Sequence, residues 1–218
     1  MSTKALSAPR VAAIVGPYLS GKTSLLEALL SHAGAIGRKG SVRDGNSVGD
    51  ASPDSRERGM STEMNVATVD YLDETWTFID CPGSIELAQE ALNALMISDA
   101  AVVCVDADPA KAVAVGGLLR QLDDNDIPHM IFINKMDVAE KHVRETLEAL
   151  QAVSAHPLVL REIPIRDGDA VTGHVDLVSE RAFRWVEGKP SELIELPEQV
   201  RDRESEARTE MLESLADF

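Results

Sequence analysis

Short runs of apolar residues alternate along this chain with longer segments in which apolar residues recur every three or four positions. The short runs are typical of buried strands, and the longer spacing is typical of amphipathic helices. Two further runs, at 68–72 and 75–79, are separated only by Asp73 and Glu74, which predicts a hairpin. The pattern predicts strands at 11–15, 100–105 and 129–133, and helices at 24–30, from residue 88, at 110–123 and at 139–153.

The order of these elements predicts the fold class of the first part of the chain. Strands that are apolar throughout and alternate with helices form a mostly parallel sheet that helices cover on both faces. We therefore expect a three-layer α/β domain over residues 11–156. Ligands of such sheets bind at the carboxyl ends of the strands, so the polar residues that follow each strand are the candidates for chemistry.

From about residue 157 the pattern changes to short segments separated by Asp, Gly and Ser turns. Such a pattern is typical of antiparallel strands. We expect a small appended α+β subdomain, rich in strands, over residues 157–218, and a flexible lead over 1–10. Strands are predicted at 158–165, 172–178 and 182–186, and an amphipathic helix at 198–216.

The composition narrows the class of function. The 37 Asp and Glu residues outnumber the 21 Lys and Arg residues, which gives a net charge of −16. Such a surface repels phosphate backbones and anionic lipids, so we expect no independent DNA binding and no membrane association. Cys81 and Cys104 form neither a disulfide framework nor a zinc-site spacing, and no apolar run approaches the roughly 20 residues that span a bilayer. We expect a cytoplasmic protein, and a monomer.

Residues 16–23, Gly-Pro-Tyr-Leu-Ser-Gly-Lys-Thr, match the phosphate-loop pattern G-x-x-x-x-G-K-[ST] at every fixed position. Gly16 and Gly21 let the backbone curl so that its N–H groups point at a phosphate, and the following helix adds a favourable dipole. Lys22 supplies a charge for the outer phosphates, and Thr23 offers a hydroxyl to Mg²⁺. The alternative is a glycine-rich turn that carries Lys-Thr by chance. The strand before the loop and the helix after it favour a nucleotide-phosphate site.

Two further motifs follow strands in the same order as in a GTP site. Asp80 can hold Mg²⁺ through water, and Gly83 offers an N–H to a γ-phosphate, although D-x-x-G alone is a weak pattern. Asn134-Lys-Met-Asp137 is more specific. The Asp137 carboxylate can accept hydrogen bonds from the N1–H and the exocyclic amine of guanine, a donor pair that adenine does not offer. The three motifs together predict a guanine-nucleotide site, with Asn134 and Lys135 supporting the loop and covering the base.

With these residues the chain resembles the translational GTPases, most closely the first domain of elongation factor G and of its divergent paralogues. The resemblance covers about residues 10–218. Arg56-Glu-Arg-Gly59 is similar to the family's E-R-G run in the first switch, and Asp80-Cys-Pro-Gly83 is similar to its D-T-P-G. Residues 172–178 and 182–185 are similar to the T-G-V-V-D-L-V and A-x-x-W segments of the subdomain that elongation factor G inserts within its G domain, which small signalling GTPases lack.

The resemblance implies a P-loop NTPase fold with a GTP-binding domain over 11–156 and an inserted subdomain over 157–218. It implies Mg²⁺ with GTP or GDP as the bound cofactors, and the ribosome as a partner of the full-length factor. The chain ends at Phe218, before the base-contacting S-A loop and the last sheet elements of the family, so we expect a fragment or a truncated version. Ser154-Ala155 could stand in for that loop, but its place just before Pro157 favours a helix terminus.

At three positions the chain departs from the family's pattern. Ser84 stands where the family has a histidine that positions the attacking water on the ribosome, and serine has no imidazole and a shorter reach. Ser61 takes the place of the switch-one threonine and keeps a hydroxyl for Mg²⁺. Leu19 replaces an aspartate, so any contact of that carboxylate with a monovalent cation is lost.

Two functions from different classes follow. The first is an enzyme that binds Mg²⁺-GTP, hydrolyses it to GDP and phosphate and acts as a ribosome-linked switch. The second is a module that binds GTP or GDP with little or no hydrolysis because of Ser84. A third interpretation, an ATP-using P-loop protein, requires the 134–137 motif to be accidental. The candidate catalytic residues are Lys22, Gly83 and Ser84, the candidate metal ligands are Thr23, Ser61 and Asp80, and the candidate nucleotide-binding residues are Gly16, Leu19, Ser20, Gly21, Lys22, Thr23, Ser24, Asp80, Gly83, Asn134, Lys135 and Asp137.

Overall fold

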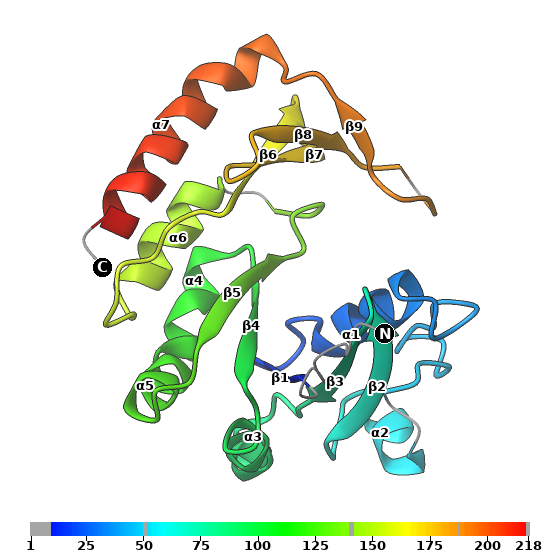
Figure 1. Cartoon of the computed structure of the whole chain (residues 1–218). Coiled ribbons are helices and arrows are strands. Elements are labelled where there is room, and N and C mark those ends of the chain that lie inside the picture. Colours follow the sequence, from blue (N-terminus) through cyan, green and yellow to red (C-terminus); the bar gives the residue numbers. More distant parts are fainter. Residues whose placement is uncertain (1–9, 50–51, 140–141, 187, 217–218) are drawn as a thin grey trace, which may run out of the picture. The chain divides into compact units, whose positions relative to one another are not determined.

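A computed structural model describes residues 10–49, 52–139, 142–186 and 188–216. These residues form two compact units, whose elements are labelled in Figure 1. The first unit contains the described residues up to Asp106 together with 114–134, and the second contains 107–113 and the described residues from Lys135 onward. The flexible lead predicted for 1–10 lies outside the described residues except for Arg10, which begins a strand.

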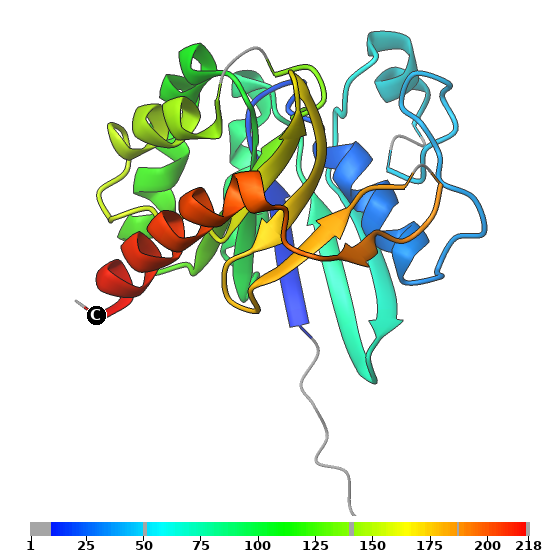
Figure 2. The same ribbon diagram turned by 90° about the horizontal axis from the view of Figure 1, so that it is seen from above.

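The first unit is built on a five-stranded sheet with the strand order β2-β3-β1-β4-β5. Strands β3, β1, β4 and β5 run parallel, and β2 pairs antiparallel with β3 at the edge of the sheet. The β2–β3 hairpin (Figure 2) turns at Leu72 and Asp73, which both have positive φ values as two-residue hairpin turns require. The predicted mostly parallel α/β sheet is confirmed. Its strands are β1 (Arg10–Val15), β2 (Asn65–Tyr71), β3 (Glu74–Asp80), β4 (Ala100–Asp106) and β5 (His129–Asn134).

Helices flank this sheet, and Figure 1 shows α1 and α3 on opposite sides of β1. The side chains of Leu26 and Leu30 on α1 pack with Ile14 of β1 and Val69 of β2, and all four are almost completely buried. This packing fixes the start of α1 at the end of β1, where the phosphate loop lies. The helices of this unit are α1 (Lys22–His32), α2 (Pro53–Arg58), α3 (Ala88–Leu95) after the 3₁₀ turn η1 (Ile85–Leu87), and α5 (Gly116–Asp124).

Three helices differ from the sequence predictions, and one of them, predicted over 139–153, spans only Val143–Gln151. The helix predicted over 110–123 is divided into α4 (Pro109–Ala112), the 3₁₀ turn η2 (Val113–Val115) and α5. Helix α2 was not predicted and lies within the polar segment that follows α1. Its signal is local, since the Ser52 hydroxyl accepts a hydrogen bond from the Ser55 amide and Pro53 occupies the first turn.

The second unit is built on a four-stranded antiparallel sheet with the order β6-β7-β8-β9. This sheet confirms the predicted strand-rich subdomain. Its aliphatic core joins the sheet to α7, whose Val200, Ala207 and Met211 pack with Val175 and Leu177. Strand β9 was not predicted because its three residues are too few to show a pattern. The elements are α6 (Val143–Gln151), β6 (Glu162–Asp167), β7 (Ala170–Asp176), β8 (Arg181–Arg184), β9 (Glu192–Ile194) and α7 (Glu198–Ala216).

The two compact units meet in the chain between Asn134 and Lys135, and α6 belongs to the second of them. The domain boundary expected between residues 156 and 157 therefore stays a prediction. Ser154 lies in the turn that ends α6, where its amide donates to the carbonyl of Leu150 at 3.0 Å. Ser154 and Ala155 thus mark a helix terminus, as the sequence favoured. Within the described residues, no helix has both the length and the apolar character needed to cross a membrane.

Candidate nucleotide site

The loop between β1 and α1 has a shape that requires glycine near both of its ends. Gly16 has φ of 141°, and a Cβ at this position would overlap the main-chain oxygen of Cys104. Gly21 has φ of 91°, and a Cβ there would overlap the side-chain amide of Asn134. Both φ values lie where residues with a side chain are strained. The two glycines of the phosphate-loop pattern are therefore explained by close approach of β4 and β5.

The Ser20 carbonyl in the middle of the loop is held by two neighbouring strands. Asn134, the last residue of β5, donates its Nδ2 to this carbonyl at 2.9 Å, and the thiol of Cys104 on β4 donates at 3.1 Å. Burial raises the pKa of the Cys104 thiol, which keeps the thiol protonated as a donor. Cys104 is buried, but it also supports the loop, and no sequence motif indicates that contact.

The first turn of α1 is arranged to receive an anion. Its N-cap is Gly21, which has no side chain to bond the first amides of the helix, so these N–H groups remain available to a phosphate. Lys22 is buried and donates its Nζ to the Pro17 carbonyl at 2.9 Å, which folds the ammonium back over the loop. Ser20 is buried within the loop, whereas Leu19 and Ser24 are exposed at its surface.

The three candidate metal ligands converge next to this turn. The Thr23 hydroxyl donates to Oδ2 of Asp80 at 2.7 Å and lies 3.3 Å from the hydroxyl of Ser61. These residues come from the start of α1, the end of β3 and the segment after α2, and Thr23 and Asp80 are almost completely buried. Hydroxyl and carboxylate oxygens are the ligands that Mg²⁺ prefers, so the residues present fit this ion.

Gly83 lies against the same group. A Cβ at Gly83 would overlap Nζ of Lys22 and come within 2.7 Å of the Pro17 carbonyl, so the backbone after β3 approaches the lysine closely. Ser84 follows directly, is partly buried and begins the 3₁₀ turn η1. Between Asp80 and Gly83, Cys81 is fully buried, and burial, with the neighbouring Asp80 charge, raises the pKa of its thiol from 9.0 to about 12. Cys81 is therefore a buried, protonated residue.

The residues predicted to bind the guanine base are divided between the two units. Asn134 belongs to the first unit and contacts the loop, whereas Lys135 and Asp137 are counted with the second. Lys135 has a positive φ of 60°, and Asp137 is exposed to solvent. Their recognition of a guanine base stays a prediction.

Two further residues near the metal side were missed by sequence reasoning. Gly49 is buried, and a Cβ there would lie 2.7 Å from the methyl group of Thr23 and 3.2 Å from Oδ2 of Asp80. Glu27 on α1 has no exposed surface and accepts hydrogen bonds from the amides of Gly40 and Val48. Glu27 looks like one more polar residue of an amphipathic helix, and only the tertiary contacts show what it binds.

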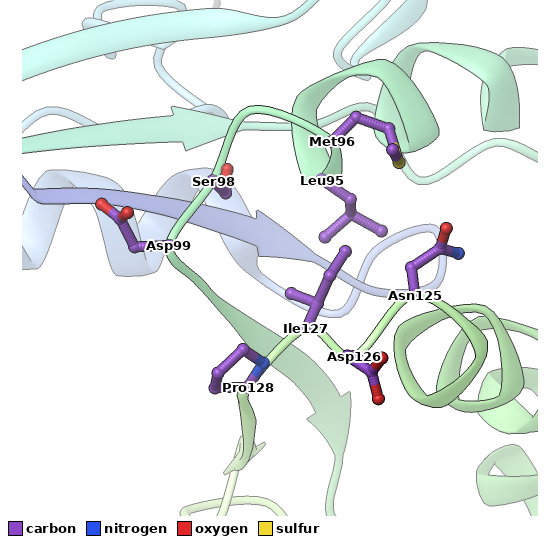
Figure 3. Close-up of a pocket in the computed structure, with 8 residues that line it drawn as sticks. All are labelled: Leu95, Met96, Ser98, Asp99, Asn125, Asp126, Ile127 and Pro128. Atoms are coloured by element: carbon purple, nitrogen blue, oxygen red, sulfur yellow. The ribbon is translucent and has the colours of Figure 1, made fainter.

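A small cavity of about 260 Å³ lies elsewhere in the first unit, where β4 and β5 begin (Figure 3). The phosphate loop lies at the opposite ends of the strands, so this cavity is not part of the nucleotide site. Its polar groups are engaged within the chain, since Asp99 accepts from the Val11 amide and Asn125 donates to the Gln121 carbonyl. The lining residues are Leu95, Met96, Ser98, Asp99, Asn125, Asp126, Ile127 and Pro128.

Residues 8–207 match the family model of the elongation factor Tu GTP binding domain. The chain belongs to this family. The resemblance to the translational GTPases is thereby confirmed, and the family is one of GTP-binding domains. The alternative of an ATP-using protein of another family is not supported, because the match covers nearly the whole chain.

Individual relatives agree with the family. An elongation factor G-like protein of Synechocystis sp. is 46% identical over 209 residues, which are 96% of this chain and 31% of that protein. The mitochondrial ribosome-releasing factor 2 of Danio rerio is 32% identical over 91% of this chain and 27% of its own length. A crystal structure of a Thermus thermophilus protein has a TM-score of 0.86 and 27% identity, over 94% of this chain and 30% of the other. The chain thus spans less than a third of the length of these relatives.

Proposed function

We propose that this chain binds Mg²⁺-GTP and hydrolyses it to GDP and phosphate, as the GTP-binding domain of a translational factor similar to elongation factor G. One observation carries the proposal. In a chain of the elongation factor Tu GTP binding domain family, the buried Lys22, Thr23 and Asp80 gather with Ser61 at the carboxyl ends of β1 and β3. This arrangement places a cation, two hydroxyls and a carboxylate around the start of one helix.

The phosphate loop binds the nucleotide by its main chain. The amides of residues 16–23 and the first turn of α1 donate to the phosphates, with the positive end of the helix dipole behind them. Lys22 stabilises the negative charge that develops on the outer phosphate oxygens during transfer. Gly83 presents its amide beside the lysine, where it meets a γ-phosphate but not the shorter GDP. Binding of GTP and GDP is therefore distinguished at this residue.

Thr23, Ser61 and Asp80 are the residues that hold Mg²⁺. When bound, the ion supplies positive charge that neutralises the phosphate oxygens. The Thr23 hydroxyl already bonds Asp80, so the carboxylate orients the oxygen lone pairs of Thr23 away from itself and toward a ligand. Ser61 comes from the segment after α2, which makes that segment responsive to what occupies the site.

Asp137 accepts the two guanine donors, Lys135 covers the base, and Asn134 links this strand end to the phosphate loop through Ser20. Leu19 and Ser24 line the mouth of the loop. Asn134 bonds the phosphate loop directly within the first unit.

A second candidate function is GTP or GDP binding with little or no hydrolysis. Ser84 favours it, because a hydroxyl at the start of η1 has neither the reach nor the basicity of an imidazole for orienting water. If the chain is an enzyme, the loop around Ser84 orients the attacking water while the chain is bound to a partner. In the binding module, the chain would exchange nucleotides as a signal only.

The partner we propose is the ribosome, reached through the full-length factor, because the similar proteins are named as elongation and ribosome-releasing factors. We propose a cytoplasmic monomer. The charge of −16 argues against independent binding to DNA or to an anionic membrane.

Calorimetric titration of the purified chain tests nucleotide recognition. We expect binding of GTP and GDP in the presence of Mg²⁺ and much weaker binding of ATP. Asp137→Asn provides a matched variant, because an amide donates where the carboxylate accepts, and it should lose guanine preference while keeping the phosphate loop intact. Binding of GTP and ATP with equal affinity by the unmodified chain would contradict the proposal.

Turnover separates the enzyme from the binding module. GTP hydrolysis is measured with the full-length factor and ribosomes, for the unmodified protein and for Ser84→His. A stimulated rate that rises on substitution supports the interpretation that Ser84 limits hydrolysis. An unchanged rate would show that water is positioned by another group, and no hydrolysis by either protein would favour the binding module.

A further inference from the structure

The carboxylate of Glu27 binds a loop that is remote in sequence from it. Its two oxygens accept from the amides of Gly40 at 2.7 Å and of Val48, which are 13 and 21 residues further along the chain. Glu27 is fully buried in the middle of α1. A buried carboxylate is tolerated when charge-assisted hydrogen bonds replace its water, and here main-chain amides provide them.

These two bonds close the loop 40–48 at its two ends. Inside the loop, the Ser41 amide donates to the side chain of Asn46 at 2.7 Å and the Asn46 amide donates to the Ser41 carbonyl at 3.3 Å. Gly40 lies so close to the other end that a Cβ would meet the Asn46 carbonyl at 2.5 Å. The segment 40–48 is therefore a small closed loop that Glu27 attaches to α1, beside which it runs in Figure 2.

The residue that leaves this loop is Gly49, which packs against the candidate metal ligands. A Cβ placed on Gly49 would lie 2.7 Å from the Thr23 methyl group and 3.2 Å from Oδ2 of Asp80. Val48 and Gly49 are adjacent, so a bond to the Val48 amide fixes where Gly49 lies. The carboxylate of Glu27 thus controls how closely the loop covers Thr23 and Asp80.

We propose that Glu27 is a positioning residue, which fastens the loop 40–48 to α1 and thereby holds Gly49 over the metal side of the nucleotide site. The loop shields Thr23 and Asp80 from water and slows the release of a bound nucleotide. The effect on nucleotide release rests on the proposed function. The fastening itself does not, because both hydrogen bonds are made within the chain.

Amide hydrogen exchange of the chain without added nucleotide tests the fastening. In Glu27→Gln one oxygen becomes an NH₂ group, which cannot accept from an amide, so exchange at the amides of Gly40, Val48 and Gly49 should become about ten- to a hundredfold faster. Exchange in β1 and β4 should change much less, which a general loss of stability would not produce. The control Glu148→Gln removes an exposed charge from α6 and should change none of these amides.

A second variant opens the loop without touching Glu27. Gly40→Ala places a methyl group against the Asn46 carbonyl and the Ser47 Cα, so it should accelerate exchange of the same amides. Gly37→Ala is its control, since nothing lies within 4 Å of a Cβ at residue 37. If both Glu27→Gln and Gly40→Ala leave the loop amides as protected as in the unmodified chain, the proposal that Glu27 fastens the loop to α1 is wrong.

Release of a fluorescent GDP analogue in Mg²⁺ then tests the effect on the site. We expect release to be about tenfold faster in Glu27→Gln and in Gly40→Ala than in the two controls. Faster loop exchange with unchanged GDP release would overturn the proposed effect on the site. Absence of GDP binding by the unmodified chain would instead contradict the proposed function, and the exchange result would still decide the fastening.

Discussion

The two units of the molecule place their buried polar groups differently. In the first unit, buried polar side chains collect where β1 and β3 end, and Ser20, Lys22, Thr23 and Asp80 lie within a few residues of two strand ends. In the second unit, the core cluster between the sheet and α7 is aliphatic, buried polar side chains such as Thr146 and Glu204 are scattered on helices, and ion pairs such as Arg184 with Glu192 lie at the surface. Parallel strands direct their carboxyl ends to one edge, whereas antiparallel neighbours alternate. Topology thus gathers the phosphate and candidate metal residues in the first unit, whereas the second unit contributes Lys135, Asp137 and an aliphatic core.

The largest expected effect comes from a glycine of the first unit. Gly16→Ala forces a methyl group into the Cys104 carbonyl at a φ that side chains avoid, and we expect a loss of about 4 kcal/mol or more in the free energy of unfolding, with no nucleotide binding. Gly168→Ala is the matched change in the β6–β7 turn, where φ is 59° but nothing lies near, and should cost about 1 kcal/mol. Urea unfolding measures both. If the two substitutions lower the free energy of unfolding equally, the expected difference between the units is wrong.

Leu177→Ala is expected to destabilise the second unit by about 3 kcal/mol, because a fully buried leucine leaves a cavity in its core. Below the unfolding transition, affinity for GDP should stay the same, since Leu177 belongs neither to the phosphate loop nor to the 134–137 segment. Urea unfolding and GDP titration of the same preparation check the two parts. A large loss of GDP affinity would contradict the separation of packing from chemistry.

Lys22→Ala should weaken nucleotide binding, the property that Leu177→Ala should leave unchanged. It removes a cation that forms charge-assisted bonds, and we expect a loss of about 2 kcal/mol in binding, or roughly thirtyfold in affinity for GTP. Its matched control is Lys189→Ala, which removes an exposed lysine of the second unit and should leave affinity unchanged. Calorimetry with Mg²⁺-GTP measures both. If the control weakens binding as much as Lys22→Ala, the effect is one of net charge rather than of the site.

The last expected effect, confined to alkaline pH, is a pH dependence from Cys81. Its pKa is raised from 9.0 to about 12 by burial in the folded chain, so the unfolded chain loses this proton first. The stabilising contribution is full below pH 9 and is lost as pH rises from about 9 toward 12. Urea unfolding at a series of pH values should show the free energy of unfolding falling over this range, with a shallower fall in Cys81→Ala. Equal slopes for the two proteins would assign the dependence to other groups.

The sequence predicted the parallel sheet because its strands carry their own signal. The apolar runs at 11–15, 100–105 and 129–133 agree with β1, β4 and β5 to within one residue at each end. The phosphate-loop residues and the candidate metal residues were predicted from sequence motifs, and their roles stay predictions. Lys22, Thr23, Ser61 and Asp80 then prove to lie together.

Features that depend on contacts between distant residues could not be predicted. The bond from the Cys104 thiol to Ser20 joins residues 84 positions apart, and nothing in the local pattern distinguishes this cysteine from other buried residues. Glu27 and Gly49 acquire their roles only when the polar segment after α1 returns to that helix. In contrast, α2 had a local signal at Ser52 and Pro53 that was overlooked in a segment interpreted as loop.

The glycines at 16 and 49 differ in how evolution could replace them. At Gly16 the obstacle is a main-chain oxygen, which every amino acid at position 104 carries, so no second substitution can make room. At Gly49 the nearest obstacle is the methyl group of Thr23. A serine at position 23 would remove that methyl group and keep the hydroxyl. Thr23→Ser would therefore relieve the shortest contact at position 49 and leave Asp80 Oδ2 at 3.2 Å as the next, whereas no side-chain substitution relieves the contact at position 16.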